Sequence, residues 1–251
     1  MKQAIAVVSF GTTYHNATGA IECIERAVAA AHPDRNFYRA YTSGMVRRRL
    51  MERDGIRIYD PETLLKELTE QGYEDILVQP THVIPGLEYE KLILAAARYE
   101  QVRVCRPLLW EAADYEECVR AVMELLPELA DDEGAVLMGH GTTHFANAAY
   151  AQLEHEFRAA GQENVFVGTV EGFPDLDFVR SRLKRTPLKK LYLAPFMIVA
   201  GDHAQNDLAG EEEDSWNSIL RADGYATEII LRGLGDSERI VQLLVKHSLE
   251  A

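Results

Sequence analysis

Short apolar runs alternate with amphipathic segments along the whole chain. A continuous apolar run such as residues 3–10 is typical of a strand that is covered on both faces, as in a parallel sheet. In the segment that follows it, Ile21, Ile24 and Val28 recur at the spacing of one helix face. We predict strands at residues 3–10, 36–41, 75–80, 102–108, 135–138, 165–170, 190–195 and 226–231, with the apolar stretch 196–200 extending the seventh. This alternation indicates an α/β protein.

The second half of the chain repeats the pattern of the first. The matching segments are 11–17 with 141–147, 36–44 with 164–172 and 76–86 with 191–201, at offsets of 141 − 11 = 130, 164 − 36 = 128 and 191 − 76 = 115. The order is the same in both halves, and the offsets drift by amounts that loops can absorb. We therefore interpret the chain as two copies of one βαβαβ unit.

The repeat predicts two domains. The acidic, turn-rich stretch 127–134 is the expected boundary, so the N-terminal half covers residues 1–128 and the C-terminal half residues 129–251. Each half is expected to form a mostly parallel four-stranded sheet flanked by helices, which is a Rossmann-like arrangement. In such a sheet, ligands bind beyond the carboxyl ends of the strands.

Three strand ends carry different side chains in the two halves. The second half has His140, Glu171 and His203 where the first has Phe10, Ser43 and Glu88. Because the carboxyl ends of parallel strands share one edge of the sheet, we expect the three side chains of the second half to converge. Two histidines and one carboxylate are a common ligand set for a divalent metal ion that keeps positions open for a substrate. The alternative is that these are ordinary polar residues at strand ends.

His140 lies in the motif Met138-Gly-His-Gly141, between an apolar strand and a helix. We expect the two glycines to clear space around its ring. A histidine in a tight turn can also cap that turn without taking part in chemistry. The match with two further strand ends is what favours a ligand role.

Other polar residues near the predicted strand ends have open roles. The arginines at 47–49 begin a helix and face either solvent or the carboxylates of a ligand. His82 either faces the predicted site or is satisfied within its own loop. Glu88, which corresponds to His203 in the repeat, is a candidate proton acceptor. The acidic run 211–214 is interpreted as a solvated turn.

The composition is that of an ordinary globular protein with an acidic balance. The 251 residues are 47% hydrophobic and 26% charged, and the formal net charge is −14. Nucleic-acid binding needs a basic face, so we expect no nucleic-acid partner. An anionic substrate has to be held by local positive groups rather than by the overall field. The sequence leaves the oligomeric state open, a homo-oligomer included.

The cysteines and the apolar runs bear on the compartment. Cys23, Cys105 and Cys118 form no CxxC motif and leave one thiol unpaired in any pairing, so we expect buried free thiols in a reducing compartment. The first apolar run is too short for a signal peptide, and no run approaches the roughly 18 apolar residues that span a membrane. These features predict a cytoplasmic protein without a membrane partner.

Six short motifs lie at the predicted strand ends and in the loops that follow them. They are Ser9-Phe-Gly-Thr-Thr13, Thr42-Ser-Gly-Met45, Glu88-Tyr-Glu-Lys91, Met138-Gly-His-Gly141, Val170-Glu171 and Val199-Ala-Gly-Asp-His203. Together they resemble the anaerobic sirohydrochlorin cobaltochelatases, which are class II chelatases. The resemblance covers nearly the whole chain. It implies two chelatase-like domains related by pseudo-twofold symmetry, with a tetrapyrrole in the cleft between them.

The resemblance also implies a reaction in anaerobic cobalamin biosynthesis. Co²⁺ is inserted into sirohydrochlorin without ATP or an organic cofactor, and two pyrrole protons are released. The Co²⁺ ligands of the family fall on His140, Glu171 and His203, and His140 is also the proton acceptor. We expect His140, His203 and Glu88 to take part in catalysis. The substrate is expected to contact Phe10, Thr12, Ser43, Met45, Arg47, Glu88 and His144.

Two other classes of function share this ligand set. A Zn²⁺ hydrolase would use a metal-bound water, with Glu88 as its acid or base. A carrier would bind metal or tetrapyrrole without turnover. Within the chelatase class, Co²⁺, Ni²⁺ and Fe²⁺ all suit two histidines and a carboxylate, so the sequence leaves the metal open.

Overall fold

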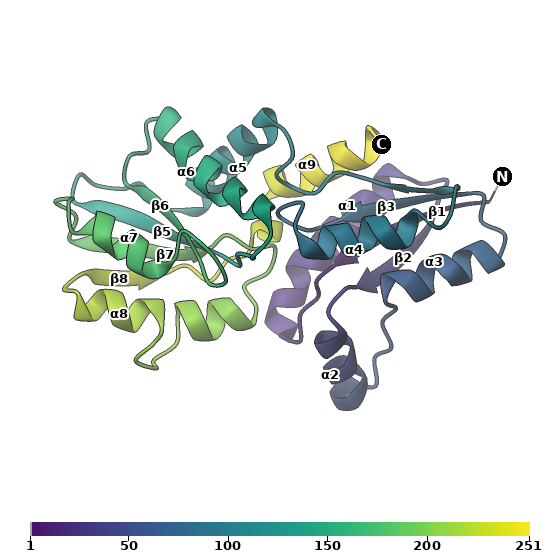
Figure 1. Ribbon diagram of the computed structural model, residues 1–251, viewed down its shortest axis with the longest axis horizontal. Coiled ribbons are helices and arrows are strands. Elements are labelled where there is room, and N and C mark those ends of the chain that lie inside the picture. Colours follow the sequence, from purple (N-terminus) through teal and green to yellow (C-terminus); the bar gives the residue numbers. More distant parts are fainter. Residues whose placement is uncertain (1) are drawn as a thin grey trace. The chain divides into compact units, whose positions relative to one another are not determined.

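The computed structural model describes residues 2–251, which form two compact α/β units (Figure 1). Unit 1 comprises the chain up to Trp110 together with Glu238–Ala251, and unit 2 comprises Glu111–Ser237. The sequence repeat divides the chain at residue 128, whereas these compact units divide it after Trp110 and return the last helix to unit 1.

Unit 1 is a parallel sheet with helices on both faces (Figure 1). Its strands are β1 (Gln3–Ser9), β2 (Asn36–Tyr41), β3 (Asp75–Pro80) and β4 (Val102–Val104), in the spatial order β2-β1-β3-β4. Its helices are α1 (Thr18–Ala31), α2 (Gly44–Asp54), α3 (Pro61–Glu70), α4 (Leu87–Ala96) and α9 (Glu238–Leu249), with a short 3₁₀-helix at His15–Ala17. Val8, Leu65 and Leu92 belong to the core that joins the sheet to α3 and α4.

Unit 2 has the same plan. Its strands are β5 (Glu133–Gly139), β6 (Val165–Thr169), β7 (Lys190–Pro195) and β8 (Ala226–Ile229), in the spatial order β6-β5-β7-β8, and all are parallel. Its helices are α5 (Ala112–Leu125), α6 (Ala148–Ala159), α7 (Leu176–Leu183) and α8 (Trp216–Ala222), with a π-helix at Ala204–Leu208 and 3₁₀-helices at Phe145–Asn147 and Leu234–Asp236. The equivalent strand orders confirm the predicted α/β fold with two four-stranded parallel sheets.

Polar side chains at the helix starts explain where several helices begin. Ser43 accepts a hydrogen bond from the Val46 amide at the start of α2, and Asp60 accepts one from Thr63 at the start of α3. Such caps satisfy amide groups that have no partner within the helix. Pro61, at the first position of α3, fits there because that position needs no amide donor.

Three predictions about local structure are corrected. Residues 196–200 do not extend β7, because the carbonyls of Met197 and Ile198 accept hydrogen bonds from the Leu234 and Gly235 amides instead of forming a sheet ladder. Strand β4 ends at Val104 rather than continuing to residue 108. Cys105 and Cys118 are buried free thiols as expected, but the free thiol of Cys23 is exposed.

The last helix packs within unit 1. Helix α9 contacts α1 and β3, and His32 Nε2 lies 2.9 Å from Ser248 Oγ at the α1–α9 contact. Arg103, at β4, donates a hydrogen bond of 2.6 Å to the Ala251 carbonyl. Within residues 2–251, no helix is both long enough and apolar enough to cross a membrane.

Both units bury a glutamate on the helix that follows their first strand. Glu25 of α1 and Glu154 of α6 are separated by 154 − 25 = 129 positions, which matches the offsets of the repeat. Glu25 accepts a hydrogen bond of 2.6 Å from Arg39 Nε, and Glu154 accepts one of 2.8 Å from the Val167 amide. A buried carboxylate costs free energy unless it is paired, so these contacts hold helix and sheet together in both copies.

Candidate metal centre

The strand order of unit 2 brings three predicted ligands to one edge of its sheet. His140 directly follows β5, the strand between β6 and β7. Glu171 lies two residues after β6, and His203 directly precedes the π-helix that follows β7. One ligand atom from each side chain lies within 4.8 Å of the other two. In the part of the chain that the structure describes, this is the only such group of three or more His, Cys, Asp or Glu side chains.

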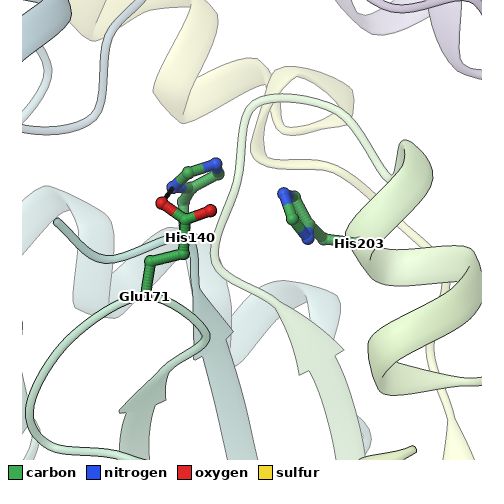
Figure 2. Close-up of side chains that lie close together, drawn as sticks. All are labelled: His140, Glu171 and His203. Carbon is green, nitrogen blue, oxygen red and sulfur yellow. Dashed lines mark ion pairs between the residues drawn. The ribbon is translucent and has the colours of Figure 1, made fainter.

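The three side chains face one another (Figure 2). The rings of His140 and His203 are perpendicular, with centroids 4.7 Å apart, and His140 Nδ1 lies 3.9 Å from Glu171 Oε2. With metal–nitrogen bonds of about 2.1 Å, two ligand atoms of one ion lie at most about 4.2 Å apart. The ligand atoms here lie within 4.8 Å of one another, so small side-chain rotations would let all three bind one ion. The side chains are 38%, 60% and 31% exposed, in the order His140, Glu171, His203, and this leaves one side of the group open.

Hydrogen bonds orient both imidazole rings. His140 Nδ1 lies 2.9 Å from the Gly141 carbonyl oxygen, and His203 Nδ1 lies 2.5 Å from Asp207 Oδ2. Carbonyl and ionised carboxylate oxygens only accept hydrogen bonds, so in both neutral rings Nδ1 carries the proton. In this tautomer Nε2 is the ring nitrogen that can bind a metal ion or a proton.

The glycines beside His140 have close neighbours that the sequence did not reveal. A Cβ on Gly139 would lie 2.3 Å from Tyr150 Cε1, and a Cβ on Gly141 would lie 2.7 Å from Thr169 Cβ. Gly141 also has φ of +81°, which an L-residue rarely adopts. The glycines therefore make room for the Tyr150 ring and for the end of β6.

Asn147 joins the two loops that carry His140 and Glu171, and the sequence did not reveal this. Its Oδ1 accepts a hydrogen bond of 2.9 Å from the Thr142 amide, and its Nδ2 donates to the Phe173 carbonyl. Asn147 is 9% exposed, so both bonds are shielded from water. The amide side chain thereby fixes the spacing between the ends of β5 and β6.

His144 caps a turn next to this centre. Its Nδ1 accepts a hydrogen bond of 3.2 Å from the Ala146 amide at the start of the 3₁₀-helix Phe145–Asn147, and its ring lies 4.1 Å from that of Phe145. The ligand group of His140, Glu171 and His203 does not include it.

Three of the predicted substrate contacts in unit 1 have partners within the protein. Thr12 is buried, and its Oγ1 accepts a hydrogen bond of 3.1 Å from the Tyr14 amide. Ser43 caps α2, as described above. Arg47 Nη1 forms an ion pair of 3.3 Å with Asp60 Oδ2. These contacts hold the loops after β1 and β2 in place.

The other predicted contacts in unit 1 are more open. Phe10, directly after β1, is 47% exposed, and Met45, in the first turn of α2, is 56% exposed. Large apolar side chains that are exposed at strand ends are available for a flat apolar ligand.

Glu88 is a carboxylate held by positive groups. Partial burial alone would raise its pKa, but hydrogen bonds from Lys91 and Thr42 and the charge of Lys91 outweigh this and place the pKa below the ordinary value. Its Oε1 lies 2.6 Å from Lys91 Nζ. Glu88 is therefore ionised at neutral pH and accepts hydrogen bonds more readily than it retains a proton.

His82 is not satisfied by hydrogen bonds within its own loop. Both ring nitrogens are buried, and neither has a hydrogen-bond partner among the described residues. Burial lowers the pKa of His82 to about 4, against the opposing charge of Glu88. The ring is therefore neutral at physiological pH.

We expect His82 to make the protein less stable as the pH falls from 6.5 towards 4. The pKa of His82 is 6.5 in the unfolded chain and about 4 in the folded protein. Between these two values protons bind preferentially to the unfolded state and therefore stabilise it relative to the folded protein. The full pKa difference of His82 between the unfolded and folded states corresponds to about 3 kcal/mol of folding stability. Urea unfolding between pH 7 and 4.5 should show a steeper loss of stability in the wild type than in His82→Gln. Equal slopes in the two proteins would contradict the assignment.

Comparison with known proteins identifies the family. The model of the family described as cobalt chelatase (CbiK) matches residues 3–251. The chain belongs to this family. As a member of the CbiK family it is a chelatase, an enzyme of the lyase class, and the hydrolase and carrier alternatives lose their support.

Two relatives of the family align along almost the whole chain. The sirohydrochlorin cobaltochelatase of Salmonella typhimurium strain LT2 is 40% identical over 252 aligned residues, which cover 98% of this chain and 95% of that protein. The sirohydrochlorin cobaltochelatase CbiKC of Nitratidesulfovibrio vulgaris strain Hildenborough is 31% identical, with 98% of this chain and 89% of that protein covered.

Solved structures of more distant proteins share the fold. SirB from Bacillus subtilis, solved with Fe³⁺, has a TM-score of 0.65 at 17% identity, covering 100% of this chain and 95% of that one. CbiX, described as the terminal enzyme of siroheme biosynthesis in denitrifying bacteria, has a TM-score of 0.58 at 16% identity, covering 99% of both chains. At this level of identity the likeness shows the chelatase-like fold alone.

Proposed function

We propose that this protein inserts Co²⁺ into sirohydrochlorin in anaerobic cobalamin biosynthesis. The two relatives described above are named for this activity. The observation that carries the proposal is the convergence of His140, Glu171 and His203 in a chain of the CbiK family.

The open ligand group suits an ion that has to be handed over. Three partly exposed side chains hold Co²⁺ and leave coordination positions for the nitrogens of the macrocycle. As each pyrrole N–H bond breaks, its electron pair becomes available to Co²⁺ in place of a protein ligand. One divalent ion replaces two protons, so the charge of the macrocycle does not change. That the reaction needs no ATP is what the resemblance to the family implies.

The two protons need acceptors close to the metal. Histidine side chains accept and release protons near neutral pH, and a positioned base typically contributes about 100-fold to 10,000-fold in rate. We assign His140 as the proton acceptor. Its Nε2 would take a pyrrole proton once Co²⁺ has passed from that atom to the macrocycle, while its Nδ1 stays held by the Gly141 carbonyl. His203 exchanges protons and metal in the same way, and Glu171 completes the ligand set.

Residues of unit 1 supply contacts to the substrate in this proposal. Phe10 and Met45 pack against the macrocycle, and the ionised Glu88 accepts hydrogen bonds from its N–H groups. The other proposed substrate contacts are Thr12, Ser43, Arg47 and His144, and their internal hydrogen bonds or ion pairs hold them in place. The exposed Arg48 remains available to the carboxylates of sirohydrochlorin.

The free thiols Cys23, Cys105 and Cys118 support a reducing compartment, and we place the reaction in the cytoplasm. The ligand set alone also suits Ni²⁺ and Fe²⁺, so the preference for Co²⁺ rests on the family.

An anaerobic absorbance assay tests the proposed function. Purified protein is mixed with excess sirohydrochlorin and Co²⁺, with Ni²⁺ and Fe²⁺ in parallel, and His203→Ala is measured alongside. We expect conversion to the spectrum of the cobalt complex over many turnovers with the wild type, and at most about one hundredth of that rate with His203→Ala. A single stoichiometric change without turnover would indicate a carrier. Faster turnover with Ni²⁺ or Fe²⁺ would overturn the metal assignment.

A further inference from the structure

We propose that Asp207 is a positioning residue that sets the tautomer and the orientation of the His203 ring. The inference rests on the proposed role of His203 as a metal ligand. It goes beyond that role, because Asp207 is not one of the three side chains that converge on the metal position.

The contact itself is short and direct. Asp207 Oδ2 lies 2.5 Å from His203 Nδ1, and the two residues are four positions apart. Hydrogen bonds with an ionised partner are shorter and stronger than neutral ones. The carboxylate accepts a hydrogen bond from Nδ1–H, and the Nε2 lone pair then points away from Asp207. The same ring meets His140 at a right angle, with centroids 4.7 Å apart, so a rotation of His203 would remove its Nε2 from the common position of the ligands.

The backbone around both residues is anchored. Asp207 lies within the π-helix Ala204–Leu208, and His203 directly precedes it. Ala204, next to His203, and Leu208, next to Asp207, are both 0% exposed. Leu208 belongs to the core of unit 2 together with Met138 and Leu193. Two buried neighbours thus hold the histidine and its carboxylate at a constant separation, which suits a ligand that has to be oriented in advance.

The two histidines of the centre differ in their hydrogen-bond partners. His140 has a neutral backbone carbonyl at its Nδ1, whereas His203 has a carboxylate. A carboxylate partner makes the imidazole more basic towards a metal ion than a carbonyl does, and loss of such a partner typically lowers metal affinity about 10-fold to 100-fold. Asp207 is therefore expected to contribute to Co²⁺ affinity without touching Co²⁺.

Calorimetric titration of the purified full-length protein with Co²⁺ alone tests the proposal. The variants are Asp207→Asn, His203→Ala, the double variant and Asp214→Asn. Asp214 is an exposed residue of the acidic run in the same unit, so Asp214→Asn removes an equal charge without altering a contact to His203. We expect Asp207→Asn to weaken Co²⁺ binding by about 10-fold or more and to change the visible absorption of bound Co²⁺. Asp214→Asn should stay within about twofold of the wild type.

The double variant separates positioning from a general effect of charge. If Asp207 acts through His203, Asp207→Asn should weaken binding no further once His203 is alanine. An equal loss in both backgrounds would overturn the proposal. If His203→Ala weakens binding while Asp207→Asn behaves like Asp214→Asn, the positioning role fails and the metal centre stands. If His203→Ala binds Co²⁺ as the wild type does, the metal centre itself fails.

Discussion

Replacing His140 with alanine is expected to lower the rate of cobalt insertion by at least about 100-fold while leaving the fold unchanged. The substitution removes a metal ligand and the proposed proton acceptor together. The side chain is 38% exposed and does not belong to the core of unit 2, so its removal leaves no buried cavity. The flanking glycines, which determine the local backbone, remain.

The measurement compares turnover at saturating sirohydrochlorin and Co²⁺ in His140→Ala, the wild type and His155→Ala. His155 is an exposed histidine of α6, so its removal controls for the loss of one imidazole from unit 2. Circular dichroism should be the same in all three proteins, and the urea midpoint should be the same in His140→Ala and the wild type. A His140→Ala variant with wild-type turnover would disprove the assignment of His140 to the reaction.

The convergence of His140, Glu171 and His203 could be predicted because it depends on strand ends. Parallel strands place their carboxyl ends at one edge, and the repeat shows which residues stand at equivalent ends. His140, Glu171 and His203 follow three neighbouring strands, β5, β6 and β7, and the structure brings them within 4.8 Å. Neither step needs knowledge of side-chain packing, so sequence periodicity was sufficient.

The contacts that support the centre could not be predicted in this way. Two of these contacts are hydrogen bonds, made by Asn147 between loops and by Asp207 within a π-helix. The third kind is the close approach of other segments to the glycines at 139 and 141. Hydrophobic periodicity contains no signal for such contacts. The π-helix was missed for the same reason, because it interrupts the regular spacing on which helix prediction depends.

Division into compact units also depends on packing rather than on pattern. The amphipathic sequence of α9 predicts a helix, and the structure has one at Glu238–Leu249. The same pattern does not indicate which element the helix packs against. In the structure α9 packs against α1 and β3 of unit 1. An apolar face indicates that a helix is covered, but it does not identify the element that covers it.

The largest expected effect on stability comes from Glu154, the buried glutamate of unit 2. Its carboxylate accepts hydrogen bonds from the Val167 amide at 2.8 Å, from Arg158 at 2.7 Å and from Arg182. Burial raises the pKa of Glu154, and the hydrogen bond from the Val167 amide together with the charges of Arg158 and His155 opposes this rise. Burial of the carboxylate therefore costs free energy. The carboxylate contributes to stability by accepting the hydrogen bonds of the two arginines and the strand amide.

Glu154→Ala is expected to destabilise unit 2 by about 3–5 kcal/mol, because it leaves two arginines and a strand amide without their buried acceptor. Glu154→Gln keeps an acceptor for the Val167 amide and should cost less, about 1–3 kcal/mol. Urea unfolding followed by circular dichroism measures both, with the exposed Glu163→Gln as a control that should remain within about 0.5 kcal/mol of the wild type.

Since Val167 lies in β6, the strand that leads to Glu171, we also expect Glu154→Ala to weaken Co²⁺ binding near its unfolding transition. A Glu154→Ala protein as stable as the Glu163→Gln control would show that the arginines find other partners and that the buried glutamate does not hold α6 to the sheet.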